Sequence, residues 1–338
     1  MGKRKNTLSS DSSDSSNNYF KIEDYNIVDL SSLINLVEDL INKPAPPKKL
    51  KRKLPIKLFK LIDILEPLKT LQSLIGLSKL KQQLLDQLLY FVQGDNDVVM
   101  LHTVIEGPPG TGKTTVANLM TDIYSGIGIL KKRKCTIVKR EDLIGQYLGE
   151  TTLKTMETLE AAKNGVMLID EAYSLGSPDG RDSYAKEAID AINQYLTENV
   201  DKMICIIAGY KHELQQCFFS QNPGLRRRFP WTFTIEDFTS SELSDIFIKM
   251  INDTDYYELA EDVTQEFIIK LIKKEYFNGN GGDIANIISR AKIINSRMNF
   301  CKENDYIFTQ KIIKESFDQF YDVKKNSNCS DPPPMMYT

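Results

Sequence analysis

Short apolar runs alternate with longer helical patterns through the middle of the chain. The runs lie at 98–106, 135–139, 166–170, 203–208 and 231–235. Each has the length of one buried strand, whereas intervening segments such as 186–198 repeat apolar residues at helical spacing. Regular alternation of this kind predicts an α/β fold, a sandwich in which a parallel sheet carries helices on both faces.

The pattern changes towards both ends. Beyond residue 238, helical spacing continues without strands over 240–252, 264–276, 282–299 and 309–322. These segments predict a small all-helical second domain. Before the sheet, the apolar residues of 29–41 recur at helical spacing and follow Asp29, a candidate N-cap. This amphipathic helix packs either on the protein's own core or on another protein.

Composition sets the limits of the folded part. Residues 1–19 are almost entirely polar or charged, so we expect this segment to be disordered. The run of lysines and arginine at 48–53 follows a group of prolines and is either a nuclear-localisation or polyanion-binding patch or a solvated linker. The expected division is an N-terminal extension (1–55), an α/β core (66–238), a helical domain (239–323) and a flexible tail (324–338).

Bulk charge and cysteine usage exclude several classes of protein. The net charge of −3 gives no general reason to expect nucleic acid or an anionic membrane as partner. No apolar run has the length of a bilayer span. The 5 cysteines are scattered without a CxxC pair, and there are only 2 histidines. We therefore expect reduced thiols, no zinc site, and a soluble cytoplasmic or nuclear protein without a membrane partner.

A glycine-rich loop lies between the first predicted strand and the next helix. It consists of Gly107, Pro108, Pro109, Gly110, Thr111, Gly112, Lys113, Thr114 and Thr115. Its glycines let the backbone wrap phosphate groups, which successive N–H groups and the helix N-terminus attract. In such loops the lysine, here Lys113, reaches the β- and γ-phosphates, and the hydroxyl of Thr114 ligates Mg²⁺. The loop therefore predicts ATP and Mg²⁺ as cofactors.

A second motif ends the predicted strand at 166–170. Its four apolar residues are followed by Asp170 and Glu171, at the carboxyl end of the strand. In open α/β sheets, ligands bind at that edge. Asp170 is the candidate Mg²⁺ ligand, and Glu171 is the candidate general base that activates water. The two motifs together predict ATP hydrolysis.

Further motifs resemble those of one family. They lie at 74–77 (Leu-Ile-Gly-Leu), 143–150, 169–175, 186–190, 208–210 (Ala-Gly-Tyr) and 222–226 (Asn-Pro-Gly-Leu-Arg). In this order they resemble the CbbX/CfxQ and SpoVK-like branch of the AAA+ ATPases, over residues 66–322. The resemblance implies a P-loop αβα core, a helical lid, ATP at their junction, and a ring of subunits, commonly a hexamer.

The resemblance also assigns roles to single residues. Ile75 and Gly76, with Leu74, would border the adenine. The pore loop that grips substrate would consist of Tyr147, Leu148 and Gly149. An arginine finger for the neighbouring subunit would be Arg226 or Arg228, with Arg227 between them; the alternative is a basic surface cluster.

The chain departs from the family pattern at two places. Where many AAA+ proteins have a polar residue after the fourth strand, it has Ala-Gly-Tyr at 208–210. The lid motif GNAR reads Gly-Asn-Gly-Gly at 279–282, so Gly282 replaces the arginine, and Arg290 lies two turns further along. We expect a ring-forming ATPase that remodels an unidentified protein client through its pore. The alternatives are a nucleic-acid-associated motor or loader and a weakly hydrolysing switch.

Overall fold

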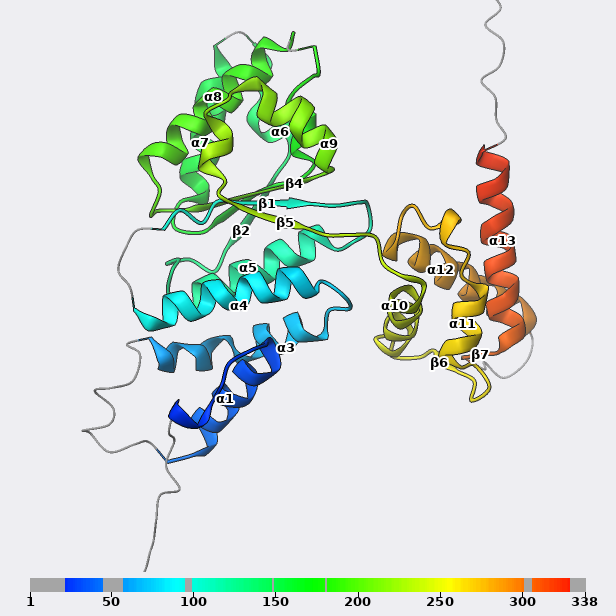
Figure 1. Ribbon diagram of the computed structural model, residues 1–338. Coiled ribbons are helices and arrows are strands. Elements are labelled where there is room, and N and C mark those ends of the chain that lie inside the picture. Colours follow the sequence, from blue (N-terminus) through cyan, green and yellow to red (C-terminus); the bar gives the residue numbers. More distant parts are fainter. Residues whose placement is uncertain are drawn as a thin grey trace, which may run out of the picture.

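The computed structural model describes residues 22–44, 57–94, 99–147, 149–179, 181–300 and 306–328 (Figure 1). The disorder expected for 1–19, the basic run 48–53 and Leu148 of the expected pore loop lie outside these residues. So do residues 329–338 of the expected tail, whereas 324–328 continue the last helix.

A five-stranded parallel sheet forms the centre of the larger part. Its strands are β1 (Thr103–Glu106), β2 (Cys135–Val138), β3 (Val166–Ile169), β4 (Ile204–Gly209) and β5 (Trp231–Thr234). Their order is β2-β3-β4-β1-β5, so β1 lies between strands that come later in the chain. Glu106 lies opposite Gly209 and Thr234, so β1, β4 and β5 end level with one another. The expected α/β fold is confirmed.

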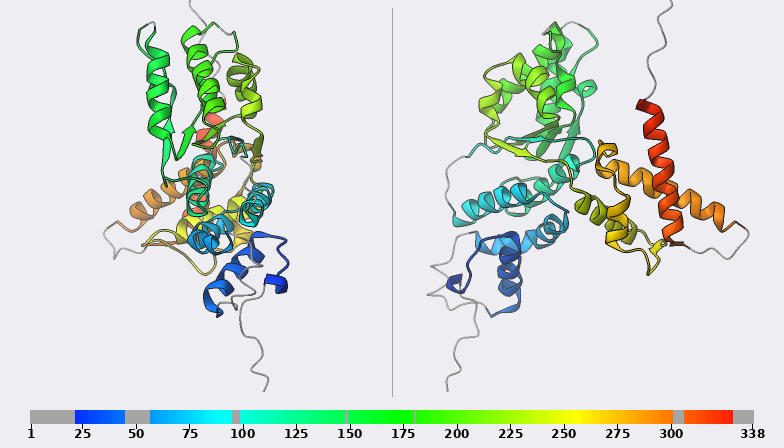
Figure 2. Two further views of the ribbon diagram at one scale, coloured as in Figure 1. Left: turned by 90° about the vertical axis from the view of Figure 1, so that its left-hand side faces the viewer. Right: turned by 45° about the vertical axis from the view of Figure 1, so that its right-hand side comes forward.

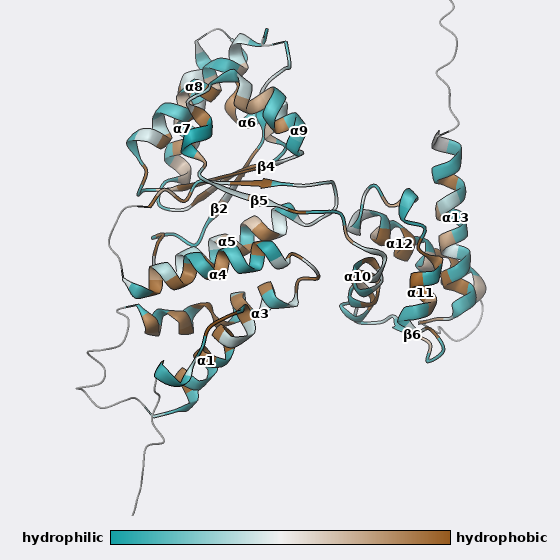
Figure 3. Ribbon diagram, viewed as in Figure 1, coloured by the Kyte–Doolittle hydropathy of each residue, from teal (hydrophilic) through white to brown (hydrophobic). Residues whose placement is uncertain are grey.

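Helices cover both faces of the sheet, as Figure 2 shows. Adjacent residues of a strand point to opposite faces, so Val104 and Ile105 belong to different cores. The face of Ile105 packs on α4 (Ser78–Gln93) and α5 (Lys113–Gly126), and the other on α7 (Glu150–Ala162) and α8 (Ser183–Glu198). Apolar and polar residues recur in turn along both α4 and α5, the pattern of a helix with one apolar, buried side and one polar side (Figure 3).

Short elements connect these layers near the ends of the strands. They are α6 (Arg140–Leu143), η3 (Ala172–Leu175), α9 (Lys211–Glu213), η4 (Leu214–Phe218), η5 (Phe219–Gln221) and η6 (Leu225–Arg228). Arg140 joins two of them, because its guanidinium donates to the Ser174 carbonyl of η3 (2.7 Å) and pairs with Asp182, which caps α8. The segments that follow β2 and β3 are thereby fixed to each other.

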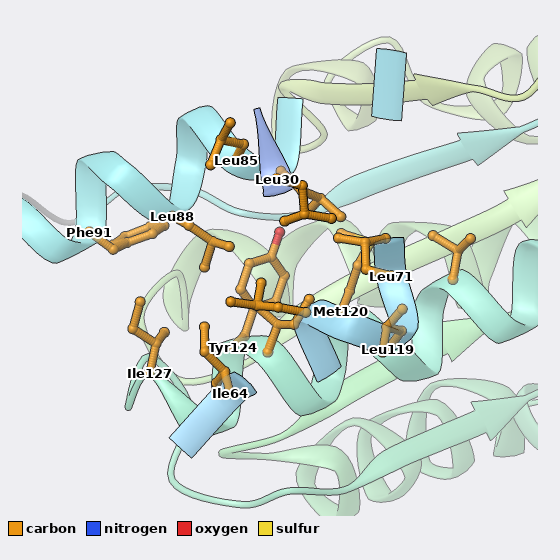
Figure 4. Packing of buried hydrophobic residues seen from close by; sticks show 14 of the residues in the cluster. Leu30, Ile64, Leu71, Leu85, Leu88, Phe91, Leu119, Met120, Tyr124 and Ile127 are labelled. Atoms are coloured by element: carbon orange, nitrogen blue, oxygen red, sulfur yellow. The ribbon is translucent and has the colours of Figure 1, made fainter. Parts of the chain in front are cut away.

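An N-terminal layer packs under α5. It comprises η1 (Ile22–Asp24), α1 (Leu30–Asn42), η2 (Leu58–Ile64) and α3 (Leu65–Ser73). Asp29 caps α1 by accepting a 2.8 Å hydrogen bond from the Ser32 N–H. The apolar side of α1 belongs to the same core as α4 and α5 (Figure 4). The helix expected at 29–41 therefore packs on the protein's own core.

The contact of η2 with α5 is close. A Cβ atom added at Gly126 would lie 2.3 Å from the Ile64 Cγ2 atom. Within this core the Tyr124 hydroxyl donates to the Gln87 Oε1 atom at 2.7 Å, and burial raises the pKa of Tyr124 (Figure 4). The helix that begins with Lys113 thus ends against the N-terminal layer.

The C-terminal part has a separate core. Its helices are α10 (Ser240–Asn252), α11 (Gln265–Leu271), η7 (Lys274–Tyr276), α12 (Gly281–Met298) and α13 (Gln310–Asn328), packed around Phe247, Phe277 and Phe317. The helical region agrees with the expectation. A parallel pair of strands, β6 (Glu258–Leu259) and β7 (Ile307–Phe308), was not predicted, because two residues are too few to show a periodicity. No helix within the described ranges combines the length and apolar character needed to cross a membrane.

Candidate nucleotide site

The glycine-rich loop connects β1 to α5 at the carboxyl edge of the sheet (Figure 1). Gly110 and Gly112 have φ angles of +69° and +82°, in the left-handed region that glycine tolerates best. The loop bounds a cavity of about 260 Å³, which Asp170, Glu171 and Tyr210 line from the other side. The loop and the acidic strand end, more than fifty residues apart in sequence, therefore face one cavity, as their motifs predicted.

Lys113 points into the loop and is almost completely buried. Its ammonium donates to the carbonyls of Gly107 (3.0 Å) and Pro108 (2.8 Å) and lies 5.1 Å from the centre of the Tyr210 ring. Burial lowers the pKa of Lys113, and the charges of Glu171 and Asp170 oppose that shift. A cation at this position, beside the N-terminus of α5, suits phosphate groups.

The two carboxylates at the end of β3 have different surroundings. The Asp170 Oδ2 atom accepts a 3.1 Å hydrogen bond from the Thr114 hydroxyl. Glu171 has a φ of +54°, which is uncommon outside glycine. Burial, and then the charge of Asp170, raises the pKa of Glu171, whereas Lys113 lowers it. A carboxylate with a raised pKa is a stronger base, so Glu171 has the chemistry to accept a proton from water.

Thr114 and Asp170 are suitable ligands for Mg²⁺. Their oxygens are hard donors 3.1 Å apart at the edge of the phosphate cavity. In the part of the chain that the structure describes, no group of three or more His, Cys, Asp or Glu side chains could hold a metal ion. Mg²⁺ commonly binds through one or two carboxylates, waters and substrate phosphates, so this pair fits the ion without such a group.

A second cavity, of about 430 Å³, continues from the loop between the core and the C-terminal helices. Leu74, Ile75 and Leu77 line it together with Phe238 and Met250, which gives an apolar slot suited to an adenine ring. Gly76, expected to border the adenine, is not among the lining residues. A Cβ atom added there would lie 2.6 Å from the Glu242 carboxylate of α10, so Gly76 contacts the C-terminal helices instead.

Two lysines hold the loop that precedes α4. The Lys81 ammonium of α4 donates to the Leu74 carbonyl at 2.5 Å, and the Lys249 ammonium of α10 donates to the Ser73 carbonyl at 2.8 Å. Burial and the charge of Lys249 lower the pKa of Lys81. One wall of the adenine slot is thus attached both to the core and to the C-terminal part.

The segment 279–282 lies directly on the phosphate loop. The Gly281 N–H donates to the Gly110 carbonyl at 3.1 Å, and a Cβ atom added at Gly110 would lie 1.9 Å from the Gly279 carbonyl oxygen. A Cβ atom added at Gly282 would meet nothing within 4 Å. Arg290 lines neither cavity, so it does not replace the arginine expected at position 282.

Asn280 joins the two parts with its side chain, which is fully buried. Its Oδ1 atom accepts from the Phe238 N–H at 3.1 Å, and its Nδ2 atom donates to the Asp237 carboxylate at 2.8 Å. Residues 237 and 238 form the connection between β5 and α10. Asn280 therefore fixes the start of the C-terminal part to the segment beside the phosphate loop.

The three arginines of η6 lie away from the phosphate cavity of their own chain. The Arg226 guanidinium donates to the Thr232 hydroxyl (3.3 Å) and lies 4.7 Å from the Phe219 ring centre. Arg227 is exposed, whereas Arg228 is half-buried close to His102. If Arg226 or Arg227 contacts a phosphate, that phosphate would therefore belong to a nucleotide bound by another subunit.

The expected pore loop is at the surface. The Tyr147 side chain is 69% exposed, and its backbone N–H donates to the Glu150 carboxylate at 3.2 Å. Gly149 has a φ of +86° and is the N-cap residue that precedes α7. Tyr147 does not line the phosphate cavity, and only the family resemblance connects the two.

Tyr210, Asn280 and Lys249 are site residues that the sequence motifs did not assign. Tyr210 directly follows β4, so its position at the carboxyl edge of a central strand was a usable signal. Asn280 and Lys249 are beside the nucleotide cavities only because the C-terminal helices fold back onto the core. No local pattern predicts that contact.

Comparison with known proteins gives the family. Residues 103–233 match the "ATPase family associated with various cellular activities (AAA)". A cfxQ-like protein of Acanthamoeba polyphaga mimivirus is 35% identical over 285 residues, which span 82% of this chain and 69% of that protein. The chloroplastic ribulose bisphosphate carboxylase/oxygenase activase of Cyanidioschyzon merolae is 36% identical over 246 residues, 70% of this chain and 83% of that protein. Protein CbbX of Cereibacter sphaeroides is 38% identical over 194 residues, 57% of this chain and 62% of that protein.

Solved structures agree on the fold. The AAA domain of FIGL-1 in complex with ADP superposes with a TM-score of 0.50 at 18% identity, covering 76% of this chain and 90% of that domain. A RuvB variant of Thermotoga maritima superposes with a TM-score of 0.53 at 16% identity, covering 74% of this chain and 72% of that protein. With the sheet order, the helical C-terminal part and the cfxQ-type relatives, these findings establish that the chain belongs to the CbbX/CfxQ branch of the AAA+ ATPases and binds nucleotide.

Proposed function

We propose that the chain hydrolyses ATP with the residues that meet at the cavity between β1 and β3. Lys113 and the N–H groups of the glycine-rich loop bind the phosphates, while the slot beside Ile75 takes the adenine. Thr114 and Asp170 would hold Mg²⁺, which neutralises charge on the phosphates when it is bound. Glu171 takes the proton of the attacking water, and its raised pKa supports that role.

We further propose that a ring of these subunits uses hydrolysis to remodel a protein client through its pore. The observation that carries the proposal is the exposure of Tyr147, 69%, on a loop whose backbone is held by Glu150. An exposed aromatic ring on a fixed loop can contact an extended chain without requiring a particular sequence. One relative is named as an activase of ribulose bisphosphate carboxylase/oxygenase. No described residue of this chain identifies the client of this chain.

The arginines of η6 support assembly into a ring. An arginine supplied by a neighbouring subunit stabilises charge on the transferring phosphoryl group. Arg226 and Arg227 have exposed side chains and do not line the phosphate cavity of their own subunit. In a head-to-tail ring they can therefore contact the phosphates bound by the neighbouring subunit. Arg228 is the less available candidate, because it is half-buried beside His102.

The client proposal is tested by measuring ATP turnover with β-casein, an unfolded protein, and with single-stranded DNA. Casein should stimulate turnover, and Tyr147→Ala should remove the stimulation but keep the basal rate. Tyr256→Ala is the matched control, since that tyrosine is 71% exposed on the C-terminal part. Stimulation by DNA alone would favour the nucleic-acid-associated motor, and negligible turnover in every condition would favour the switch.

The ring proposal is tested by mixing two inactive variants. Glu171→Gln subunits keep the arginines, and Arg226→Ala/Arg227→Ala subunits, which lack both exposed arginines, keep Glu171. If the arginines act on a neighbour, the mixture regains activity, because some interfaces then combine both intact halves. The rate per wild-type subunit should also rise with protein concentration as light scattering detects oligomers. A rate that stays constant through that transition contradicts catalysis between subunits.

A further inference from the structure

The loop that leads into β2 is strongly basic. It ends with four successive exposed side chains: Lys131, Lys132, Arg133 and Lys134. Because these residues precede β2, they lie at the amino edge of the parallel sheet, whereas the nucleotide site lies at the carboxyl edge. None of the four lines the phosphate cavity or the adenine slot. The proposed hydrolysis of ATP therefore gives these residues no role.

Backbone hydrogen bonds join this loop to the loops before the next two strands. The Lys132 N–H donates to the Asn164 carbonyl at 2.8 Å, and the Asn164 N–H donates to the Lys202 carbonyl at 2.6 Å. Lys163 precedes β3 and Lys202 precedes β4, so each of these loops adds a lysine to the same edge. Neighbouring strands lie about 4.8 Å apart, so the three loops together span roughly 10 Å. Residues 131–134, 163 and 202 are called the basic edge below.

Half of the basic edge has no acidic partner. Arg133 pairs with Asp122 at 2.6 Å, and Lys163 pairs with Glu160 at 2.8 Å. Within the described part of the chain, three of its side chains form no ion pair: Lys131, Lys132 and Lys134. Three uncompensated charges within four residues give a local positive potential, although the net charge of the whole chain is −3.

The shape and composition of the basic edge favour the backbone of a nucleic-acid duplex. The loop segments 131–134, 163–165 and 201–202 contain no aromatic residue, so they lack the stacking platforms with which proteins bind single strands. The phosphates of one strand of a duplex follow one another every ~3.4 Å along its axis, so an edge roughly 10 Å wide meets about three of them. Lysine contacts to phosphates position a duplex but do not read its sequence.

The backbone of the basic loop is fixed, which argues against its use as an extended peptide signal. The Lys132 N–H is bonded to Asn164, and the Lys134 carbonyl accepts a 2.9 Å hydrogen bond from the Val166 N–H. A receptor that binds a basic peptide in an acidic groove would have to break these bonds. A duplex needs only the lysine side chains, which are exposed.

We propose that the basic edge binds the phosphate backbone of a nucleic-acid duplex without regard to its sequence. The lysine ammonium groups contact phosphate oxygens and release bound counterions, so the affinity falls as the salt concentration rises. The duplex lies across the amino ends of β2, β3 and β4, and ATP binds at their carboxyl ends, so both ligands can be bound at once. This surface goes beyond the proposed remodelling of a protein client, because it would hold the ATPase on a nucleic acid that does not enter the pore.

The proposal is tested by fluorescence anisotropy of a short labelled duplex at several NaCl concentrations, with the full-length protein. Lys131→Gln/Lys132→Gln/Lys134→Gln removes the three unpaired charges and keeps the backbone. The slope of log Kd against log[NaCl] should decrease by about 2.7, since each lost phosphate contact removes about 0.9. At low salt the Kd should rise by about tenfold or more. A DNA duplex and an RNA duplex of the same sequence distinguish the two sources of such a backbone.

Lys270→Gln/Lys311→Gln/Lys314→Gln is the matched control, because it removes the same charge from exposed lysines of the C-terminal part. Its slope and Kd should be those of the wild type. Equal slopes in the two triple variants overturn the proposed site. Tighter binding of a single strand than of the duplex overturns the choice of partner. So does a loss of binding to phosphatidylserine vesicles in the basic-edge variant while its duplex affinity is unchanged.

The basic-edge variant should also keep the basal ATP turnover and the oligomeric state of the wild type. Unchanged turnover shows that the variant is folded, since none of its three substitutions lies at a nucleotide cavity. Loss of oligomers in light scattering would assign the lysines to a contact between subunits and would overturn the proposal. The anisotropy assay contains no ATP, so its result is independent of whether the proposed hydrolysis and remodelling are correct.

Discussion

Removing the Asn280 side chain should weaken the junction between the core and the C-terminal helices. In Asn280→Ala the buried Phe238 N–H loses its acceptor, which costs about 1–3 kcal/mol. The Asp237 carboxylate loses its 2.8 Å donor but is exposed and can bind water, so this loss adds about 0.5–1.5 kcal/mol. The expected decrease in the free energy of unfolding is about 1.5–4.5 kcal/mol. The affinity for ATP should fall as well, because segment 279–282 contacts the phosphate loop.

Urea unfolding followed by circular dichroism measures the stability change. Asn280 has a φ of +46°, where alanine is strained, so Asn280→Gly is needed to separate the backbone from the side chain. The glycine variant should be destabilised by the lost hydrogen bonds alone. The control is Asn252→Ala at the exposed end of α10, which should stay within about 0.5 kcal/mol of the wild type. If Asn280→Gly and Asn252→Ala were equally stable, the side-chain hydrogen bonds would not stabilise the junction.

Other perturbations test the site and the core. Glu171→Gln should keep ATP binding but lower turnover by about 100-fold or more, whereas Lys113→Ala should weaken binding itself; equal turnover in Glu171→Gln and wild type would exclude Glu171 as base. A Cβ atom added at Gly282 meets nothing within 4 Å, so Gly282→Arg should be tolerated and should tighten ATP binding by about tenfold, measured against Gly282→Ala; equal Kd values would place position 282 away from the phosphates. His102 has its pKa lowered from 6.5 to about 4, mainly by burial, so its contribution to stability is present above pH 6.5 and is lost as the pH falls towards 4. Urea titrations should show a loss of about 2 kcal/mol near pH 5 that is absent in His102→Gln; an equal loss in both proteins would assign it to other groups.

The chemistry of the phosphate cavity was predictable because it depends on short segments. The glycine-rich loop occurs between a strand and a helix, and Asp170 and Glu171 end another strand, so the edge of a parallel sheet brings them together. The helices were predictable for a similar reason, since an apolar stripe reports one buried side. To predict these features requires only the local spacing of residues and the general rule that ligands bind at the carboxyl edge of a parallel sheet.

Features that depend on contacts between distant segments were not predictable. Gly76 carries the family motif, yet it faces Glu242 of α10 rather than the adenine slot. Asn280 was known only as part of an altered motif, and its hydrogen bonds to 237 and 238 follow from how the C-terminal part docks. The strands β6 and β7 pair across almost fifty residues and consist of two residues each, which leaves no pattern in the sequence.

The close packing of η2 on α5 has a consequence for synthesis of the protein. The N-terminal layer leaves the ribosome before the core, but the Ile64 side chain packs on α5, and the apolar side of α1 belongs to the same core as α4 and α5, which are made later. α5 in turn is held in place by β1, whose neighbours β4 and β5 follow later still. The nascent N-terminal layer therefore remains without its native partners until most of the sheet has emerged, and its apolar residues are exposed to chaperones during that interval.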